Sequence, residues 1–389
     1  MFILEKPYVS EFLKQTLIEK GYTVLDNETA RRAFEDKPAG MVPAEEFLAQ
    51  YKRAPECPVY SNSENAIDWM DGHLDIGGLP DKIRLFKDKG AFRDLLKDLY
   101  PDFYYRMAAL EGLDSVAPAE LPFPCVVKPS VGFFSLGVHM VESAADWPGA
   151  LDAIHSEVSR IRTMYPAKVL ELDNFIIEQC IEGEEFAVDA YFDKQGNPVI
   201  INILGHLFAS SDDVGDRCYI TSPKIISEHH DEFIALLAEI GKRADLRNFP
   251  IHIELRRDNS GHIGIIEVNP MRFAGWCVTD LAYYAYGINP YEYFMESKIP
   301  DWGKISNCCK GKVYAMIIGD IDSSVDCSKI KSVNYEAFLS NFTKPLELRK
   351  IDYREYPVFA FTFAEVEEEN MEELKKMLHA DFTQYLEFE

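Results

Sequence analysis

The sequence predicts a mixed α/β (α+β) protein built from several lobes. Short apolar strands alternate with helices near the N-terminus, a pattern typical of a small parallel sheet, whereas longer strand pairs joined by turns fill the middle of the chain. At 389 residues, 47% of them hydrophobic, the chain has material for more than one core. We expect an N-terminal α/β lobe over 1–100, a central domain over 101–305 divided into 101–172 and 173–305, and a C-terminal α/β lobe over 306–389.

Composition narrows the function classes. The formal charge of −25, from 40 basic and 65 acidic residues, argues against nucleic acid or an anionic membrane surface as the main partner. The eight cysteines form no CxxC pair, which favours reduced thiols. The first residues lack the apolar run of a signal peptide, and no stretch approaches eighteen uninterrupted apolar residues. We therefore expect a cytoplasmic protein.

The N-terminal lobe is predicted from three short apolar runs and a helix. Strands are expected at 2–4, 22–25 and 58–60, and a helix at 10–20 that Gly21 ends. None of the turns in this region carries a GxGxxG or GxxxxGK[ST] pattern, so a Rossmann or P-loop nucleotide site is not expected in this lobe. Residues 81–100 are expected to form one helix, stopped by Pro101 and unusually basic for so acidic a protein.

A glycine-rich loop is predicted between two strands at 123–127 and 138–141. Lys128 is expected at the end of the first strand, and the loop then contains Gly132, Ser135 and Gly137. Glycines let backbone N–H groups turn toward an anion, and a serine adds a hydroxyl donor. An ordinary hairpin turn would leave the two phenylalanines of this loop without a place to be buried. The pattern therefore favours a flap that closes over phosphate groups.

A candidate metal site lies on the strand pair near residues 251–255 and 263–268. Glu267 and Asn269 are two residues apart, so their side chains leave an extended strand on the same face. In an antiparallel hairpin Glu254 would lie opposite Glu267, which would place three oxygen ligands together, as suits Mg²⁺. The alternative interpretation is a pair of core acids, each paired with Arg256, Arg257 or Arg272.

The remaining elements are predicted from apolar periodicity and turn residues. They are strands over 174–181, 185–192 and 199–204, helices over 232–242 and 276–286, and then strands at 313–318, 358–363 and near 385 with helices over 335–342 and 367–378. The last group is expected to form a small lobe of its own.

Five motifs in the central region resemble those of the ATP-grasp superfamily of carboxylate–amine (or thiol) ligases. The likeness covers roughly residues 81–294. In order, the motifs are DKGAFRDLL with Lys89, VVKPSVGFFSLGV with Lys128, IIEQCIEGEEF with Glu178 and Glu185, HIELR with Glu254, and IIEVNP with Glu267 and Asn269. Each motif alone is a weak signal, but their order and spacing together are specific.

The resemblance implies that two antiparallel sheets hold ATP between them. Lys89 (with Lys82 as its alternative) and Lys128 would contact the phosphates or the N7 side of adenine. The glycine-rich loop, with Gly132, Ser135 and Gly137, would cover the β- and γ-phosphates. Main-chain groups of Gln179, Cys180 and Ile181 would hydrogen-bond to the adenine edge. Glu178 would bind the adenine amino group, and Glu185 would bind the ribose hydroxyls.

The resemblance also implies a metal centre and a catalytic arginine. Glu254, Glu267 and Asn269 would hold two Mg²⁺ ions, with Mn²⁺ as a substitute, and Arg272 would sit over the transferred phosphoryl group. A second basic residue is expected from the connection over 205–224, with Arg217 preferred to His206 and Lys224.

The function implied is an ATP-dependent, ADP-forming ligase of the amino-acid or peptide ligase type. It would activate a carboxylate as an acylphosphate for attack by an amine, so its partners would be small-molecule acids and amines. Two alternatives stay open at this point: a small-molecule kinase of the same fold and a non-catalytic nucleotide-binding module. A homodimer is also expected as possible, with the C-terminal lobe as the place of its contact.

Overall fold

The computed structural model describes residues 1–34, 36, 38, 40–131, 137–164, 171–210 and 215–388; for 160–164 and 171 only the backbone is described. The N-terminal lobe holds a four-stranded parallel sheet, as the sequence predicts. Its strand order is β3-β2-β1-β4, formed by Met41–Val42, Val24–Leu25, Phe2–Ile3 and Tyr60–Ser61. Helices α1 to α4 accompany it, at Glu11–Lys20, Glu28–Ala33, Ala44–Arg53 and Ile67–His73.

Helix α1 shows why the predicted helix begins and ends where it does. The Ser10 hydroxyl accepts a hydrogen bond from the backbone N–H of Leu13, which satisfies one of the free donors at the helix start. At the other end Gly21 adopts a φ of 63°, a left-handed conformation that glycine enters without a steric penalty. The helix prediction for this segment is confirmed.

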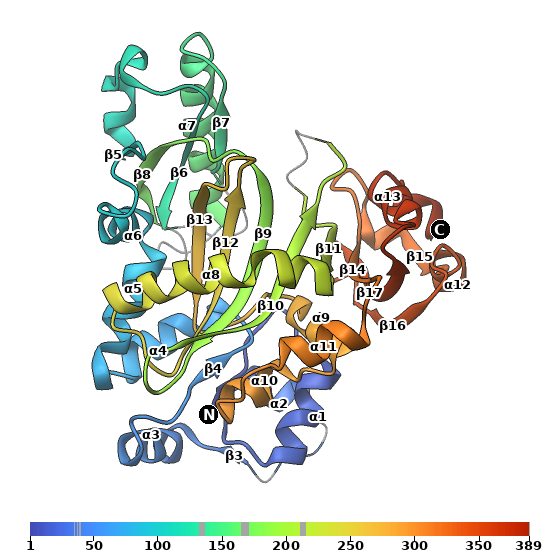
Figure 1. The fold of residues 1–389 in the computed structure, drawn as a ribbon. Helices are drawn as coiled ribbons and strands as arrows, with labels where there is room; N and C mark the ends of the chain where they lie inside the picture. The colour runs from blue at the N-terminus through green and yellow to red at the C-terminus, as the bar shows by residue number, and fades with distance from the viewer. Residues whose placement is uncertain are drawn as a thin grey trace.

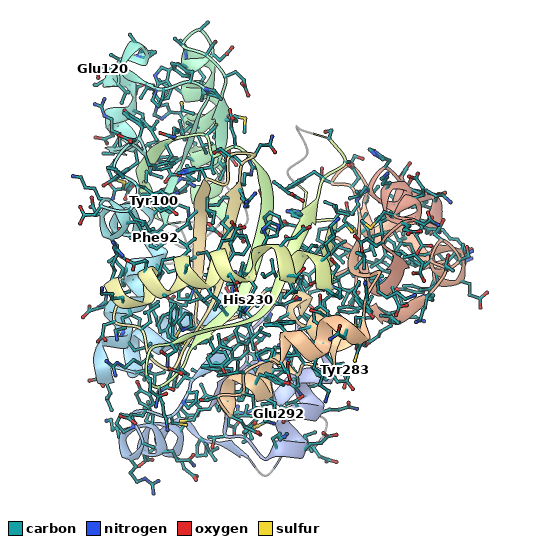
Figure 2. All side chains as sticks on the ribbon, in the orientation of Figure 1. Phe92, Tyr100, Glu120, His230, Tyr283 and Glu292 are labelled. Carbon is teal, nitrogen blue, oxygen red and sulfur yellow. The ribbon has the colours of Figure 1, made fainter. Side chains whose placement is uncertain are left out.

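The single helix expected over residues 81–100 is wrong: the segment forms two helices. α5 (Leu79–Lys87) ends at Asp88, whose carboxylate then accepts hydrogen bonds from the backbone N–H groups of Gly90 and Ala91 and so begins α6 (Lys89–Leu96). An aspartate at a helix N-cap competes with continuation of the preceding helix. The break places Lys87 and Lys89 on either side of a bend. Figure 2 labels Phe92 on α6 and Tyr100 just after it, both where this segment meets the large sheet.

A four-stranded antiparallel sheet forms the small lobe seen above the large sheet in Figure 1. The order is β5-β8-β6-β7, from Tyr105–Ala109, Glu171–Gln179, Cys125–Val131 and His139–Val141, and α7 (Trp147–Met164) packs against it. Strand β6 runs through Lys128 and Pro129, so Lys128 lies inside the strand, not at its end as expected. The expected boundary after residue 172 falls within β8; the chain passes to the large sheet only after Gln179.

The large sheet has eight antiparallel strands in the order β13-β12-β9-β10-β11-β14-β17-β16. Its first five strands span Ile263–Pro270, Phe249–Arg257, Glu184–Phe192, Pro198–Leu207 and Cys218–Thr221. Helix α8 (Pro223–Arg243) crosses one face of this sheet (Figure 1). The other face packs against the N-terminal lobe and the short helices α9 (Leu281–Tyr286) and α10 (Pro290–Met295). Both faces of β9 are therefore covered, and seven of its nine residues are buried.

The C-terminal strands extend the large sheet. β14 (Lys312–Asp320) pairs with β11, and β17 (Val358–Glu367) and β16 (Pro345–Lys350) follow it. The expectation of a lobe with a sheet of its own therefore fails for these three strands. β15 (Ile330–Val333) and β18 (Leu386–Phe388) form a separate pair, and α11, α12 and α13 span Trp302–Cys308, Tyr335–Leu339 and Glu372–Leu378. Among the described residues, none of the helices is long and apolar enough to cross a membrane.

Candidate active site

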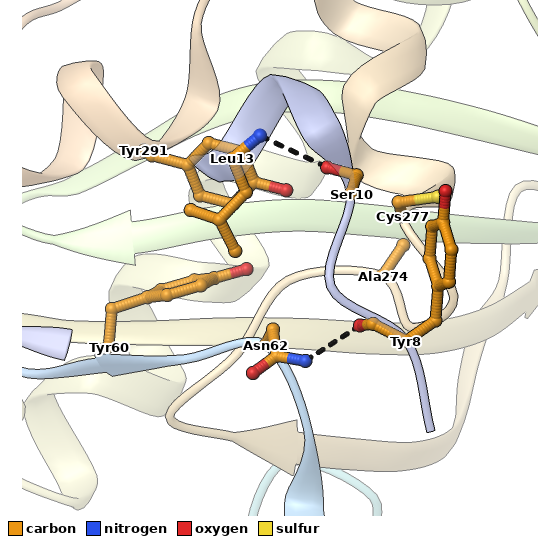
Figure 3. A pocket seen from close by; sticks show the side chains of 8 residues that line it. All are labelled: Tyr8, Ser10, Leu13, Tyr60, Asn62, Ala274, Cys277 and Tyr291. Atoms are coloured by element: carbon orange, nitrogen blue, oxygen red, sulfur yellow. Dashed lines mark hydrogen bonds between the residues drawn. The ribbon is translucent and has the colours of Figure 1, made fainter. Parts of the chain in front are cut away.

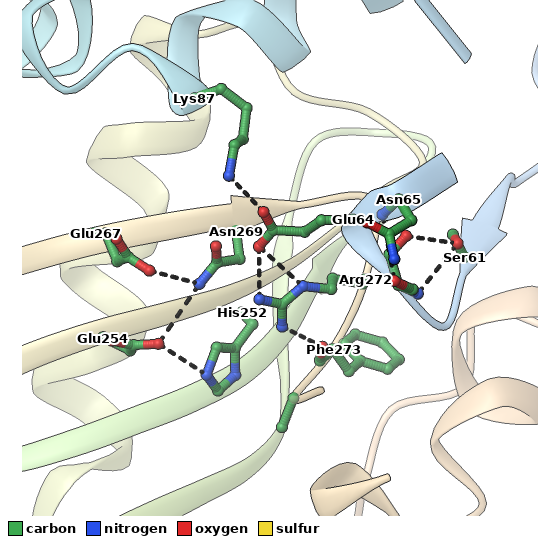
Figure 4. A network of polar contacts seen from close by, with 12 residues as sticks. Ser61, Glu64, Asn65, Lys87, His252, Glu254, Glu267, Asn269, Arg272 and Phe273 are labelled. Carbon is green, nitrogen blue, oxygen red and sulfur yellow. Dashed lines mark hydrogen bonds and ion pairs between the residues drawn. The ribbon is translucent and has the colours of Figure 1, made fainter. Parts of the chain in front are cut away.

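The carboxylate cluster is formed by the hairpin of β12 and β13 at one edge of the large sheet. Glu254 pairs directly with Glu267, and His252 pairs with Asn269, which confirms the predicted register. The Asn269 amide nitrogen donates to Glu254 Oε1 at 3.5 Å and to Glu267 Oε1 at 3.2 Å (Figure 4). Because a rotated amide presents its oxygen at the same place, Asn269 can also act as an oxygen ligand beside the two carboxylates.

The pKa values of the two glutamates in the cluster are shifted in opposite directions. Burial and the nearby Glu267 charge raise the pKa of Glu254 above its ordinary value. Burial also acts to raise the pKa of Glu267, but Lys89 and Lys87 outweigh it and the net pKa is lowered. Lys89 Nζ lies 3.4 Å from Glu267 Oε2. Each glutamate side chain is about one-third exposed, at 32% and 31%, so the pair faces an open space.

A buried histidine ties the cluster to the next strand. His252 Nδ1 lies 2.8 Å from Asp189 Oδ1 on β9, and His252 Nε2 lies 3.5 Å from Glu254 Oε1. Burial acts to lower the pKa of His252, but hydrogen bonds to Asp189 and Glu254 outweigh it and raise the pKa to about 9. The imidazole is therefore protonated at neutral pH and bridges two carboxylates. Asp189 is completely buried and also accepts a hydrogen bond from the backbone N–H of Ala274 at 2.7 Å.

Arg272 is held over the cluster by the N-terminal lobe. Its Nε and Nη2 atoms donate to Glu64 Oε1 at 3.1 and 2.6 Å, and Nη1 donates to the carbonyl of Phe273 at 2.9 Å (Figure 4). Lys87 also donates to Glu64. Burial acts to raise the pKa of Glu64, but Lys87 and Arg272 lower it to about 2. Glu64 is thus a fixed anion that orients two cations from separate parts of the chain.

The alternative interpretation, in which nearby arginines pair with the two glutamates, does not describe this hairpin. Arg256 donates to Glu185 at 3.0 Å, Arg257 pairs with Glu232 at 2.8 Å, and Arg272 pairs with Glu64. The carboxylates of Glu254 and Glu267 therefore face each other with an amide, a lysine and a histidine around them.

A second charged cluster, the hinge cluster, lies where the chain passes from the small sheet to the large one. It consists of Arg93, Lys128 and Glu178, all at most 7% exposed. Arg93 Nε donates to Glu178 Oε1 at 2.7 Å, and Lys128 Nζ lies 2.8 Å from Glu178 Oε2. Burial acts to raise the pKa of Glu178, but the two cations lower it to about 2. Burial lowers the pKa of Lys128, and Glu178 opposes that effect.

The residues predicted at the adenine edge follow Glu178 directly. The Gln179 side chain accepts from the backbone N–H of Tyr104 at 2.8 Å, and the Cys180 N–H donates to the carbonyl of Pro124 at 3.2 Å. The carbonyl of Ile181 accepts from Arg256 at 2.9 Å. These contacts fix the short crossing between the sheets. Beyond it on β9, Glu185 contacts His206 at 3.0 Å, in addition to Arg256.

The glycine-rich flap is only partly described. Gly132 and Ser135 lie outside the described residues. Gly137 is described: it adopts a φ of 73°, and its N–H donates to Glu157 Oε1 at 3.3 Å. A Cβ atom at this glycine would also approach the Pro129 ring within 3.1 Å, so both the conformation and the space favour glycine here.

Arg217 has partners away from both clusters. Its guanidinium makes two contacts with Asp320, at 2.8 and 3.0 Å, and donates to the carbonyls of Leu378 and Ala380. It also lies 4.4 Å from the ring centre of Phe382. These contacts tie β11 to the C-terminal segment, so we leave Arg217 out of the catalytic set. The two other candidates for the second basic residue have different partners. His206 contacts Glu185, and Lys224 pairs with Glu368 at the surface.

Five residues of the two clusters were missed by reasoning from the sequence: Glu64, Lys87, Arg93, Asp189 and His252. The sequence did offer a signal for His252, which lies two residues before Glu254 on the same strand and so shares its face. Glu64 comes from another lobe and meets Arg272 across 208 residues, a contact that no local pattern predicts.

Comparisons with known proteins agree with this architecture. A family model described as an ATP-grasp domain matches residues 121–280. The fold is similar to L-amino acid ligase from Bacillus licheniformis, with a TM-score of 0.68, 16% identity, and coverage of 100% of this chain and 98% of that one. It is also similar to biotin carboxylase from Campylobacter jejuni, with a TM-score of 0.65, 13% identity, and coverage of 100% of this chain and 92% of that one. For N5-carboxyaminoimidazole ribonucleotide synthetase from Thermotoga maritima the TM-score is 0.64, the identity 13%, and the coverage 99% of this chain and 98% of that one.

No curated protein sequence matches the chain. The family model and the structural neighbours nevertheless point to the same fold as the five sequence motifs. Residues 121–280 match the model of the ATP-grasp domain, and the whole chain has a fold similar to those of the three solved structures.

Proposed function

We propose that this protein is an ATP-dependent, ADP-forming ligase that activates a carboxylate as an acylphosphate and transfers the acyl group to an amine. One observation carries the proposal: the paired carboxylates of Glu254 and Glu267 lie in register, with Lys89 beside one of them and Arg272 oriented by Glu64 close by. Acids and cations in this arrangement suit a reaction in which negative charge collects on a transferred phosphoryl group.

The residues present fit Mg²⁺. Two carboxylates that repel each other and an amide form a hard oxygen donor set, and the raised pKa of Glu254 reflects burial and that repulsion. Among the described residues no group of three His, Cys, Asp or Glu forms a metal site, so Asn269 is needed to complete the set. Glu254, Glu267 and Asn269 would hold two ions, with Mn²⁺ as a substitute. Bound metal would neutralise phosphate charge.

The hinge cluster is suited to the nucleotide. Arg93 and Lys128 carry two positive charges against the single negative charge of Glu178, so one cation is in excess in a buried place. An anionic phosphate would balance it. We assign Lys89 and Lys128, with Arg93, to the phosphates, Gln179 to Ile181 and Glu178 to adenine, Glu185 to ribose, and Gly132, Ser135 and Gly137 to the flap.

The chemistry proceeds in two balanced steps. A carboxylate oxygen of the acid forms a bond to the γ-phosphorus as the bond to the β-phosphate oxygen breaks, which yields ADP and an acylphosphate. The amine nitrogen then bonds to the acyl carbon as phosphate leaves, so an ammonium substrate gives an amide, hydrogen phosphate and one proton. Arg272, oriented by Glu64, would hold the transferred phosphoryl group, and closure over the site would exclude water from the labile acylphosphate.

We further infer that the acid and the amine are small molecules of the amino-acid or peptide type and that the protein works in the cytoplasm. The structural likeness to an L-amino acid ligase over the whole chain supports the substrate class. The eight free cysteines support a reducing compartment.

Nucleotide product analysis tests the proposal. The protein is incubated with Mg·ATP and pooled carboxylic acids, with and without pooled amines. We expect ADP to accumulate only when both pools are present. ADP with the acid pool alone would identify a kinase, and AMP would overturn the acylphosphate chemistry.

A further inference from the structure

Two lysines approach the carboxylate cluster from the bend between α5 and α6. Lys87, the last residue of α5, donates to Glu64 (Figure 4), and Lys89, the first residue of α6, lies with its Nζ 3.4 Å from Glu267 Oε2. In an unbroken helix, residues two positions apart point to different sides. The helix break at Asp88 therefore allows both lysines to reach the same part of the molecule.

One carboxylate holds Lys87 and Arg272 side by side. Glu64 Oε1 accepts from Nε and Nη2 of Arg272 at 3.1 and 2.6 Å, and Glu64 Oε2 accepts from Lys87 Nζ. Because both oxygens belong to the same carboxylate, the two positive charges are kept close together, each on its own oxygen. In Figure 4 the two side chains reach Glu64 from different sides.

Backbone contacts fix the segment that carries Glu64. The N–H of Ser61 on β4 donates to the carbonyl of Met271, in the loop that follows β13, at 2.9 Å. Next to it, the Asn62 side chain donates to the carbonyl of Tyr8 at 2.8 Å (Figure 3). The N-terminal lobe is thus joined to that loop by main-chain contacts as well as by the ion pairs, so the position of Glu64 does not depend on long side chains alone.

Both cations have N–H donors that these contacts do not use. Among the described residues, the structure gives the three donors of the Lys87 ammonium group one acceptor, Glu64. Of the five donors of the Arg272 guanidinium, three go to Glu64 and to the carbonyl of Phe273. The side chains of Lys87 and Glu64 are each 19% exposed and that of Arg272 is 13% exposed, so the pair of cations is not sealed from solvent.

Lys87 also lies close to the carboxylate cluster. Burial acts to raise the pKa of Glu267, whereas Lys89 and Lys87 lower it. Glu64 opposes the two lysines. Because Coulomb interactions weaken with distance, both Lys87 and Glu64 are near the Glu267 carboxylate. The two cations held by Glu64 are therefore next to the residues proposed to bind Mg²⁺.

From the shared Glu64 carboxylate, the remaining donors and the nearby carboxylate cluster, we infer that Lys87 binds the γ-phosphoryl group of ATP together with Arg272. The inference rests on the proposed ligase function, in which Arg272 would hold that group, and adds a second cation to it. Glu64 occupies one donor of Lys87 and so aims the others. Two cations on the phosphoryl oxygens stabilise the charge that collects there during transfer. The alternative is an ion pair that only fastens α5 to the N-terminal lobe.

Two nucleotides that differ in the terminal phosphoryl group provide the test. Kd is measured by isothermal titration calorimetry with Mg²⁺ for ADP and for β,γ-imido-ATP, an analogue that resists hydrolysis, in the wild type, Lys87→Met and Arg84→Met. Arg84→Met is the matched control, because it removes a positive charge from the same helix one turn earlier, where Arg84 pairs with Asp71 and Asp81 at the surface. Binding of ADP shows that a variant is folded, and the ratio of the two Kd values reports on the terminal phosphoryl group.

We expect Lys87→Met to raise the Kd of the analogue about tenfold relative to that of ADP, the loss of one charged hydrogen bond. Lys87→Arg keeps the charge and should retain most of the preference for the analogue, and Arg84→Met should leave the ratio unchanged. An unchanged ratio in Lys87→Met would overturn the inference and leave Lys87 in a structural ion pair. An equal rise in Arg84→Met would also overturn it, because charge at long range would then explain the effect. A wild type that binds neither nucleotide would instead refute the proposed function.

Discussion

The carboxylate cluster and the hinge cluster both combine glutamates with cations, but they shift the pKa of a central glutamate in opposite directions. In the hinge cluster two cations surround Glu178, whose pKa falls to about 2, because the cations outweigh burial. In the carboxylate cluster two glutamates face each other, and burial and mutual repulsion raise the pKa of Glu254. In the hinge cluster two cations face the single anion Glu178, whereas in the carboxylate cluster Glu254 and Glu267 face each other, with His252 and Lys89 beside them. In the function we propose, a nucleotide phosphate would balance the extra cation of the hinge cluster, and Mg²⁺ would bind at the two glutamates on the other side of the crossing at 180–183.

The largest expected effect tests the carboxylate cluster. Glu267→Gln should lower kcat by at least about 10³-fold, because it removes a charge that acts on the transferring phosphoryl group. Steady-state ADP formation measures this, with circular dichroism to check folding. Glu369→Gln, at an exposed glutamate, is the control and should retain full activity. Wild-type turnover in Glu267→Gln would remove the hairpin from the mechanism.

The next effect tests the hinge cluster through stability. Arg93→Met should destabilise the protein by about 3 kcal/mol, because it leaves Glu178 buried with one cation instead of two. Urea unfolding measures the change. Arg84→Met is the control, since Arg84 pairs with aspartates at the surface and should cost less than about 1 kcal/mol. Equal losses in the two variants would contradict a special role for the buried triad.

The pH dependence of stability sharpens the same point. The folded-state pKa of Glu178 is depressed to about 2 from an ordinary 4.5, so its contribution is fully present above about 4.5 and is lost as pH falls toward 2. The difference corresponds to about 3 kcal/mol. Unfolding free energies measured across this window should fall less steeply in Glu178→Gln than in the wild type. Identical slopes would mean that Glu178 is not held as a buried anion.

Contacts between neighbouring strands can be predicted from the sequence, whereas contacts between distant segments cannot. The pairing of Glu254 with Glu267 was predictable because strand side chains alternate with a period of two and the turn fixes the register. The two-helix break at Asp88 was not, because apolar periodicity continues across a capping residue. Arg93 and Glu64 were missed since their partners are 85 and 208 residues away. The joining of β14 to β11 is also long-range, and a strand pattern alone does not name its neighbour.

A smaller effect comes from ligand binding. Mg·ADP should raise the melting temperature by roughly 3 °C at a hundredfold excess over its Kd. The part of this gain that depends on Mg²⁺ should disappear in Asn269→Ala, since that change removes one of the three proposed oxygen ligands. Differential scanning fluorimetry with ADP, with and without Mg²⁺, measures it. A gain that is the same with and without the metal would place Mg²⁺ elsewhere.

The smallest expected effect is a gain in stability, where Arg93→Met is expected to cause a loss. Glu254→Gln should stabilise the ligand-free protein by about 1 kcal/mol at neutral pH, because it removes the repulsion between paired carboxylates, while it lowers activity. Urea unfolding without metal or nucleotide measures the change. A destabilisation comparable to that of Arg93→Met would mean that Glu254 is a satisfied structural acid and that the contrast between the clusters is wrong.

The most direct test of the proposed chemistry follows oxygen atoms. Once an acid substrate is found, it is labelled with ¹⁸O in its carboxylate and turned over with Mg·ATP and its amine. Phosphate and nucleotide are then examined by mass spectrometry. An acylphosphate requires one ¹⁸O to appear in the inorganic phosphate, with none in ADP. Label in AMP, or phosphate without label, would contradict the account.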